Sequence, residues 1–341
     1  MKTEDFDYYL PEELIAQTPV EPRDSSRLLY FNRETDTVED KIFRDIEFIL
    51  KPGDVLVRNV TRVLPARLYA YTENGGKVEI LLLKRFNLTE WEVLAKPAKK
   101  LKEGTKLVIN EELSLVSEGV YDEDQGSRKV KFEFTGVFED VISRVGEMPL
   151  PPYIHEKLKD KERYQTVYSK VNGSAAAPTA GLHFTEELLE RLKNKGVIIV
   201  DILLHVGLGT FRPVKVEDVS KHHMHSEYYE VSEEAAAVIN KAKKEGRRVI
   251  AVGTTSIRTL ESAANDDGTV RAEKGNTEIF LYPPYKFKCV EGCITNFHLP
   301  KSTLIMLISC FSTRERILEI YKYAVEHKYR FFSFGDAMLV L

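Results

Sequence analysis

The chain has 341 residues, of which 43% are hydrophobic and 30% charged, with a formal net charge of −4. This length exceeds what one compact core usually holds, so we expect two domains. No apolar run reaches the ~18 residues that span a bilayer, and the acidic N-terminus lacks the apolar stretch of a signal peptide, which predicts a cytoplasmic protein without a membrane segment. Because a protein that holds RNA by charge alone is basic overall, any RNA contact is expected to be local.

Segment 61–149 predicts a small antiparallel β-barrel. It contains short β-rich runs separated by turn residues, and evenly spaced strands of alternating polarity are typical of a small barrel or sandwich. The runs are 78–85, 91–95, 105–109, 113–116 and 129–134. Prolines at 149, 151 and 152 then interrupt strand pairing and mark a domain boundary.

Helices and strands alternate in the rest of the chain. Thr185 and Ser232 are predicted to cap two helices, each of which ends at a glycine and is followed by an apolar strand. The last helix is expected at 313–327 and the last strand near 331–334. Further strands are expected at 26–31, 54–57, 197–204 and 249–252. Such units predict an α/β domain in which helices cover both faces of the sheet.

Polar segments follow several of these strands, and α/β sheets bind ligands beyond their strand ends. Gly253 to Arg258 follows a buried strand and opens a helix headed by Thr259. Backbone N–H groups there, together with Arg258, suit a carboxylate or phosphate. The alternative is ordinary capping by Thr254 or Thr255 with a surface arginine.

Three histidines and one aspartate are candidate catalytic groups. His205 follows a predicted strand, His183 follows a run of small residues, and His298 precedes a proline-bounded helix start. Each can titrate near neutral pH, although a satisfied interior histidine is the alternative. Asp336, behind an aromatic run, is a candidate buried carboxylate.

Two basic clusters are candidate RNA contacts, although most lysine clusters are merely solvated. One contains Arg58, Arg62 and Arg67, and the other contains Lys96, Lys99 and Lys100. Cys289 and Cys293 with His298 lack a fourth zinc ligand, so no metal site is expected.

These segments occur together, in order and at matching spacing, in the S-adenosylmethionine:tRNA ribosyltransferase-isomerases of queuosine synthesis (the QueA family), which this chain resembles from Asp5 to Met338. Val60 stands where the family has Asn or Asp, and Phe334 replaces a tyrosine. The segments that carry the resemblance are 148–154, 164–168, 177–184, the loop at His205, 224–228, the Gly253 segment, 296–300 and 329–338.

The resemblance implies one α/β catalytic domain formed by 1–60 and 150–341, a mixed sheet, and an inserted barrel at 61–149. It implies two substrates, S-adenosylmethionine and a tRNA whose wobble base is 7-aminomethyl-7-deazaguanine. The products are epoxyqueuosine in the tRNA, adenine and methionine. No metal or other cofactor is implied, because S-adenosylmethionine is consumed, and we expect a monomer.

The implied reaction suggests roles for the candidates. We expect His183, His205 and His298 to share the proton transfers, and Asp336 to orient a histidine or the substrate amine. Arg258 with Thr254 and Thr255 is expected to hold the methionine carboxylate or an RNA phosphate. The other expected substrate contacts are Gly207, Gly209, Thr210, His225, Ser226, Glu227 and Asn296.

Two other functions remain open from the sequence. A methyltransferase would carry a glycine-rich loop after its first strand, which Gly207 to Gly209 matches poorly, and would release S-adenosylhomocysteine. A non-catalytic RNA-binding protein would bind many RNAs and would consume no S-adenosylmethionine.

Overall fold

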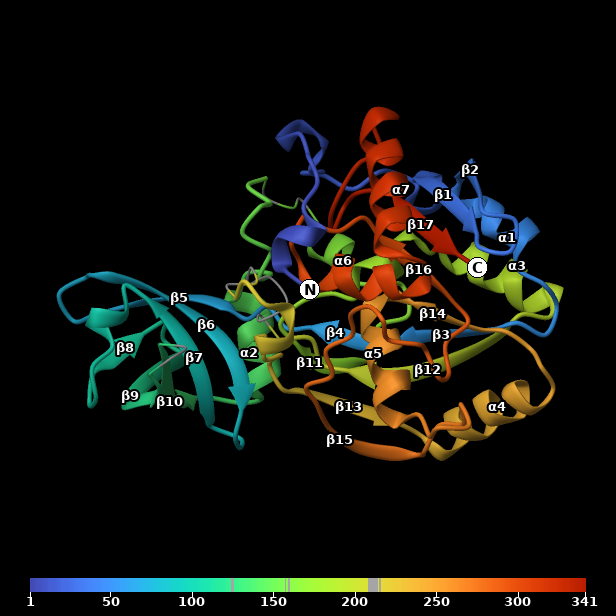
Figure 1. The fold of residues 1–341 in the computed structure, drawn as a ribbon. Helices are drawn as coiled ribbons and strands as arrows, with labels where there is room; N and C mark the ends of the chain where they lie inside the picture. Colours follow the sequence, from blue (N-terminus) through green and yellow to red (C-terminus); the bar gives the residue numbers. More distant parts are fainter. Residues whose placement is uncertain (124–125, 157, 159, 208–213, 215) are drawn as a thin grey trace. The chain divides into compact units, whose positions relative to one another are not determined.

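The protein divides into two compact units in a computed structural model that describes residues 1–123, 126–156, 158, 160–207, 214 and 216–341 (Figure 1). The first unit contains Met1–Arg62, Pro152–Val171 and Ala177–Leu341. The second contains Val63–Pro151 and, in addition, Asn172–Ala176, a segment that the sequence did not assign to it.

The described residues of the first unit form a nine-stranded mixed sheet with the order β15-β13-β12-β3-β14-β16-β17-β1-β2. The neighbouring strands β12, β3, β14 and β16 run parallel to one another. Each of β13, β15, β17 and β2 is antiparallel to at least one neighbour. The strands are β1 (Arg27–Asn32), β2 (Thr37–Ile42), β3 (Val55–Asn59), β12 (Ile198–Leu204), β13 (Glu227–Val231), β14 (Val249–Val252), β15 (Glu273–Thr277), β16 (Gly292–Asn296) and β17 (Ala337–Val340).

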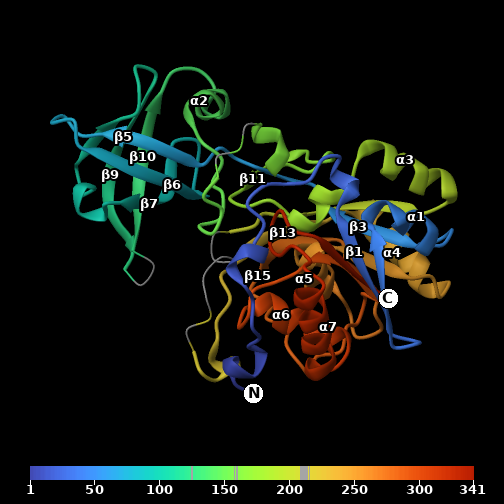
Figure 2. The same cartoon turned by 90° about the horizontal axis from the view of Figure 1, so that it is seen from above.

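The parallel strands are the buried centre of this sheet. Every residue of β3, β14 and β16 is buried, as expected for strands that are covered on both faces. On one face, Leu56, Ile250 and Ile294 pack against α1 (Ile46–Ile49) and α3 (Glu186–Lys195). Figure 2 shows these two helices on one side of the strands and α5, α6 and α7 on the other.

The other helices of this unit are α4 (Glu233–Lys244), α5 (Gly253–Ala263), α6 (Thr303–Ile308) and α7 (Arg314–Glu326). The expected caps are present: the Thr185 and Ser232 hydroxyls each accept a backbone N–H at 3.1 Å. Gly196 ends α3 with φ 98°, where a side chain would be strained. No helix in the described ranges combines the length and apolar character needed to cross a bilayer.

Two local predictions were wrong. The Gly253 segment is the first turn of α5 itself, because the left-handed φ of 83° at Gly253 turns the chain from β14 directly into the helix. The last strand lies at Ala337–Val340 and not at 331–334. The aromatic residues there suit a strand, but Phe331 packs against Phe297 and Phe332 adopts φ 75° in a turn closed by Gly335.

In the second unit, six described strands close an antiparallel barrel with the order β10-β7-β6-β5-β8-β9, as the sequence predicted. Its core includes Leu68, Ile80, Val93 and Phe132, on which Phe138 of α2 (Phe138–Val145) packs. The strands are β5 (Arg67–Tyr71), β6 (Lys77–Arg85), β7 (Glu90–Lys96), β8 (Lys106–Val108), β9 (Leu113–Asp122) and β10 (Ser127–Phe134). A separate pair of strands is formed by β4 (Thr61–Val63) and β11 (Val171–Ser174).

Candidate active site

The carboxyl ends of the four parallel strands lie along one edge of the sheet. β12, β3, β14 and β16 are consecutive neighbours, and their register aligns Ile202 with Asn59 and Val252 with Arg58 and Ile294. Three strand spacings of ~4.8 Å separate β12 from β16, roughly 14 Å in all. Polar residues follow each of these ends, so one elongated substrate can contact them together.

Arg258 and Glu227 form a buried ion pair near this edge. Arg258 lies in the second turn of α5 and Glu227 begins β13, and their side chains are 3% and 4% exposed. Glu227 Oε1 also accepts the Gly207 N–H at 2.9 Å. In the described part of the chain, Nε and Nη1 of Arg258 and Oγ1 of the buried Thr255 have no hydrogen-bond partner. These donors suit an anionic group, because hydrogen bonds from a charged guanidinium to a carboxylate or phosphate are roughly twice as strong as neutral ones.

His205 follows β12 and is fixed by Thr61, the first residue of β4. Its Nδ1 lies 2.8 Å from Thr61 Oγ1, and its ring stacks on Tyr228 at 5.9 Å between centroids. Asn59 positions both segments, because its Oδ1 accepts the N–H groups of Thr61 and Leu204 at 3.1 Å. Burial lowers the pKa of His205, so it is neutral at pH 7. Its Nε2 has no partner among the described residues and suits a proton acceptor.

His183 ends the short helix Thr179–His183 and contacts the end of β16. Its Nδ1 lies 2.7 Å from Ser26 Oγ, and its Nε2 lies 3.3 Å from Asn296 Nδ2. Burial lowers its pKa to about 3. Asn296 also donates to the Phe332 carbonyl at 2.9 Å. Phe332 has a left-handed φ, which costs about 1–3 kcal/mol in a non-glycine residue and is frequent at functional sites.

His298 lies on the other face of the sheet. Its Nε2 lies 2.8 Å from Thr295 Oγ1, and neighbouring strand residues point to opposite faces, so His298 is on the Thr295 side and His183 on the Asn296 side. The His298 backbone is held by the hydroxyls of Tyr8 and Tyr321. Burial lowers its pKa to about 3. The three histidines that the sequence grouped are therefore not brought together.

Asp336 has a backbone role in this structure. Its two carboxylate oxygens accept the N–H groups of Arg27 at 2.9 Å and Arg330 at 2.8 Å. Burial raises its pKa, and these hydrogen bonds oppose that rise. Its described hydrogen-bond partners include no histidine, so the expected orienting contact is not seen.

The remaining expected substrate contacts differ in how the structure places them. Thr254 is buried in the first turn of α5, His225 is half-buried and Ser226 is exposed before β13. Gly209 and Thr210 lie outside the described residues.

The candidate RNA-binding residues fall into two groups, those that form ion pairs within the protein and those that do not. Arg58 is buried, pairs with Asp201 at 2.7 Å and lies 4.3 Å from the Tyr168 ring, which is at odds with a surface contact. Arg62 pairs with Glu162 at 2.5 Å, and Arg67 lies 3.6 Å from Glu79. In contrast, no described acidic side chain forms an ion pair with Lys96, Lys99 or Lys100 of the barrel, the first two of which are exposed.

Sequence reasoning missed the residues that support the candidates. Asn59 and Thr61 fix His205, whereas Ser26 and the Phe332 carbonyl fix the His183 and Asn296 pair. The signal for Asn59 and Thr61 was present, since both lie shortly after the strand that the sequence predicts at 54–57. Ser26 and Phe332 reach the edge only through tertiary packing, which no local pattern reveals.

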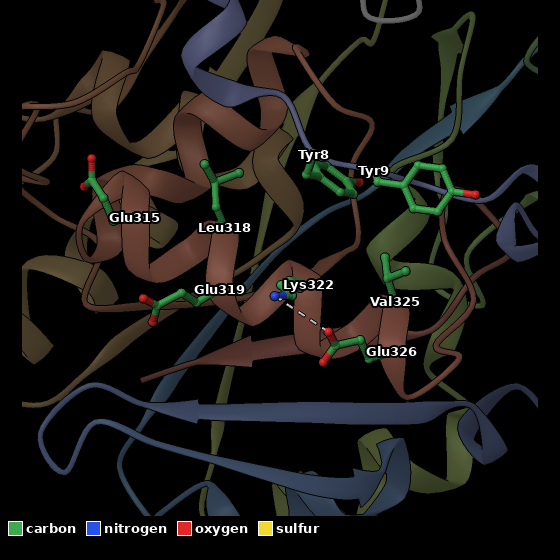
Figure 3. Close-up of a pocket in the computed structure, with 8 residues that line it drawn as sticks. All are labelled: Tyr8, Tyr9, Glu315, Leu318, Glu319, Lys322, Val325 and Glu326. Atoms are coloured by element: carbon green, nitrogen blue, oxygen red, sulfur yellow. Dashed lines mark ion pairs between the residues drawn. The ribbon is translucent and has the colours of Figure 1, made fainter.

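A separate groove lies on the outer side of α7 (Figure 3). Its volume is 470 Å³, and Lys322 and Glu326 on its wall lie 3.9 Å apart. The lining consists of Tyr8 and Tyr9 with Glu315, Leu318, Glu319, Lys322, Val325 and Glu326 of α7. Each charged wall residue has an ion-pair partner, so the groove lacks the unpartnered buried groups found at the sheet edge.

Comparisons with known proteins match nearly the whole chain to proteins of one family. The family model described as "Queuosine biosynthesis protein" matches residues 3–340. Proteins named S-adenosylmethionine:tRNA ribosyltransferase-isomerase from Carboxydothermus hydrogenoformans and Clostridioides difficile are 58% and 59% identical, and each match covers 100% of both chains.

A solved structure is also similar. The crystal structure of S-adenosylmethionine tRNA ribosyltransferase from Thermotoga maritima has 40% sequence identity and a TM-score of 0.56. The match covers 99% of this chain and 100% of that one.

Proposed function

This chain belongs to the family of queuosine biosynthesis proteins, and from that premise we propose that it moves the ribosyl part of S-adenosylmethionine onto the 7-aminomethyl-7-deazaguanine wobble base of tRNA and isomerises it there. The products are epoxyqueuosine in the tRNA, adenine and methionine. Full-length relatives that carry the name of this reaction support the proposal. Methyl transfer and RNA binding without catalysis are not favoured.

The observation that carries the proposal at the level of residues is the set of buried, unpartnered polar atoms at the sheet edge. Arg258, Thr255 and Asn296 are each less than one-tenth exposed, yet each has an atom without a hydrogen-bond partner in the described structure. Leaving such an atom unpaired costs about 1–3 kcal/mol. A bound substrate removes that cost, which argues for a ligand at this edge.

Arg258 is assigned to the methionine part of S-adenosylmethionine. Its Nη2 is held by Glu227, which fixes the guanidinium. Nε and Nη1 remain as separate donors that point in different directions, and Nη1 is assigned to the carboxylate. The N-terminus of α5 adds backbone N–H groups and a partial positive charge. Thr255 Oγ1 lies in the same turn as these N–H groups and adds a neutral donor.

His205 is assigned to proton transfer. The sulfonium acidifies the 5′ carbon of the ribose, so a base can remove a proton there, and adenine leaves after a proton reaches one of its nitrogens. The aminomethyl nitrogen of the tRNA nucleobase then adds to the opened sugar, and an alkoxide displaces methionine to close the epoxide. Neutral His205, held through Nδ1 by Thr61, presents Nε2 as the acceptor for the first step.

The barrel is assigned to RNA through Lys96, Lys99 and Lys100. Their charges have no described acidic partner, so phosphate oxygens can neutralise them with release of counterions. We propose further that the protein acts as a monomer in the cytoplasm and needs no metal or cofactor beyond its consumed co-substrate.

The reaction is tested by incubating the protein with labelled S-adenosylmethionine and anticodon stem-loops that carry or lack the aminomethyl base. Mass spectrometry is expected to find methionine, adenine and an added cyclopentane epoxide only with the aminomethyl base. Release of S-adenosylhomocysteine would instead indicate a methyltransferase, and unchanged S-adenosylmethionine would indicate an RNA-binding protein.

A further inference from the structure

The side-chain amide of Asn296 is only half satisfied. Asn296 ends β16 and is 3% exposed. Its Nδ2 donates to the Phe332 carbonyl at 2.9 Å and lies 3.3 Å from His183 Nε2. Its Oδ1 has no hydrogen-bond partner in the part of the chain that the structure describes. A buried acceptor of this kind requires an explanation, because buried polar atoms are nearly always paired.

The orientation of this amide is fixed by its surroundings. Rotating the amide by 180° would place Oδ1 against the Phe332 carbonyl oxygen, and two acceptors repel each other. That carbonyl is itself held, since it accepts the Gly335 N–H at 2.8 Å while the Phe332 N–H donates to Phe297 at 3.1 Å. Oδ1 must therefore be the unpaired atom.

The same network fixes the protonation of His183. Nδ2 of Asn296 carries hydrogens, so His183 Nε2 must accept, and the ring proton is on Nδ1, which donates to Ser26 Oγ. A protonated ring would point an N–H at the Asn296 amino group. Desolvation by burial opposes that charge further, consistent with a pKa of about 3.

From this network we infer that Asn296 Oδ1 accepts a hydrogen bond from an amino group of a substrate and that His183 is a positioning residue for Asn296. The inference rests on the proposed function, which supplies the substrates. It replaces the expectation that His183 transfers a proton, because both ring nitrogens are engaged.

An amino group fits this position better than a hydroxyl. A hydroxyl both donates and accepts, and its oxygen would need a donor in a buried site. The nearby donors, Asn296 Nδ2 and His183 Nδ1, are already used. An amino group donates one N–H to Oδ1 and brings no acceptor of its own that would need a further donor in the site. Both substrates carry one: S-adenosylmethionine on its adenine and its methionine, and the RNA on its modified base.

Two binding measurements distinguish these sources in the Asn296→Ala variant. Calorimetry gives the affinity for S-adenosylmethionine alone, and a filter assay gives the affinity for stem-loops with and without the aminomethyl group. We expect a loss of about 5- to 100-fold, the cost of one buried hydrogen bond, for whichever substrate supplies the amine. If the RNA supplies it, only the aminomethyl stem-loop should lose affinity.

Asn240→Ala is the matched control, because the side-chain amide of Asn240 in α4 also bonds backbone atoms, the carbonyl and N–H of Val270, which are not part of the candidate site. Its affinities should stay within twofold of the parent. The inference is overturned if Asn296→Ala binds both substrates within twofold of the parent. Circular dichroism and thermal melting check that each variant is folded.

The role of His183 is tested with His183→Gln, alone and combined with Asn296→Ala. Glutamine cannot titrate but can accept from Asn296. We expect the single variant to weaken the same affinity less than Asn296→Ala does, and the double variant to be no weaker than Asn296→Ala, because both act through one oxygen. The pH profile of the single-turnover rate should keep its shape. Loss of one limb of that profile with unchanged binding would overturn the positioning role.

If His183→Gln does not fold, Ser26→Ala probes the same network from its other end, since Ser26 contacts only Nδ1 of the ring. It should weaken the same affinity by a smaller factor, and an unchanged affinity would count against positioning. A parent protein that forms no ribosyl product refutes the proposed function. The binding effect of Asn296→Ala would still be measurable, so the two failures can be told apart.

Discussion

Two buried histidines at the end of β16 have almost the same electrostatic character but very different surroundings. Burial lowers the pKa of both His183 and His298 to about 3. His298 lies on the α7 side of the sheet with Thr295, Tyr8 and Tyr321. None of these four residues has a fully buried side-chain N or O atom that lacks a partner in the described structure. His183 lies on the α3 side, next to the Asn296 amide, whose oxygen has no partner among the described residues.

The difference teaches that a lowered pKa does not identify a catalytic histidine. Desolvation lowers the pKa of any buried imidazole, whatever its role. What separates the two regions is whether a buried polar atom remains unpaired. By that criterion the Asn296 region carries the proposed ligand site, whereas the His298 region does not.

The largest effect is expected at Arg258, where the unpaired donors are charged. Arg258→Lys keeps the charge but loses the two fixed N–H groups, so the single-turnover rate should fall about 10³-fold and S-adenosylmethionine binding should weaken. Arg248→Lys is the control, because Arg248 pairs with Asp54 at the opposite end of β14. Equal effects of the two variants would mean that unpaired guanidinium donors do not mark the substrate-binding site.

A smaller loss, roughly 10²-fold, is expected for His205→Gln, since a positioned general base contributes about 10²- to 10⁴-fold. The lowered pKa of His205 keeps it neutral down to pH values below its usual 6.5. Activity should therefore fall as the pH drops through that lowered pKa, and the acidic limb should vanish in the variant. An acidic limb that persists in His205→Gln would assign the base elsewhere.

The barrel should affect RNA affinity only. Replacing Lys96, Lys99 and Lys100 with alanine should raise KM for the stem-loop about tenfold at physiological salt, and the salt dependence of binding should become shallower by about two to three counterions. The turnover number should not change. The same substitutions at the exposed Lys193, Lys241 and Lys244 of α3 and α4 are the control. A similar KM in both triple variants would remove the barrel from the RNA site.

The smallest catalytic effect is expected for His298→Gln, with activity within threefold of the parent. This variant should instead change the pH dependence of stability. The unfolded histidine binds a proton below about pH 6.5 and the buried one does not until about pH 3, so His298 destabilises the native state as the pH falls between these values, by about 1.4 kcal/mol per pH unit.

Urea unfolding at pH 7 and pH 5 measures this effect. The parent should lose about 2 kcal/mol more than His298→Gln over this range. A large loss of turnover with an unchanged pH dependence would place His298 in the reaction and would erase the contrast with His183.

Much of the fold could be predicted from the sequence, because its signals are local. The caps Thr185 and Ser232, the glycine stop at 196 and the alternating barrel strands all act over a few residues. The last strand could not be predicted, because the aromatic residues at 331–334 fill the core around Phe297 in a turn and do not pair.

The sequence predicts some of the strand ends that form the candidate site, but not which side chains contact one another there. Arg258 and His205 come after strands that the sequence predicts at 249–252 and 197–204, whereas the strand that ends at Asn296 was not predicted. His298 contacts Thr295 and His183 contacts Asn296. These two strand residues are neighbours and point to opposite faces of the sheet, so a shift of one residue decides on which face each histidine lies. Such a choice is made by packing against α3 and α7, and no pattern within the segment encodes it.

A crystal structure with bound S-adenosylmethionine tests the central claim most directly. We predict that the methionine carboxylate lies within hydrogen-bonding distance of Arg258 Nη1, with the ribose 5′ carbon facing His205 Nε2. Density for the ligand beside His298 or in the groove of Tyr8 and Tyr9 (Figure 3), with Nε and Nη1 of Arg258 still without a partner, would contradict it.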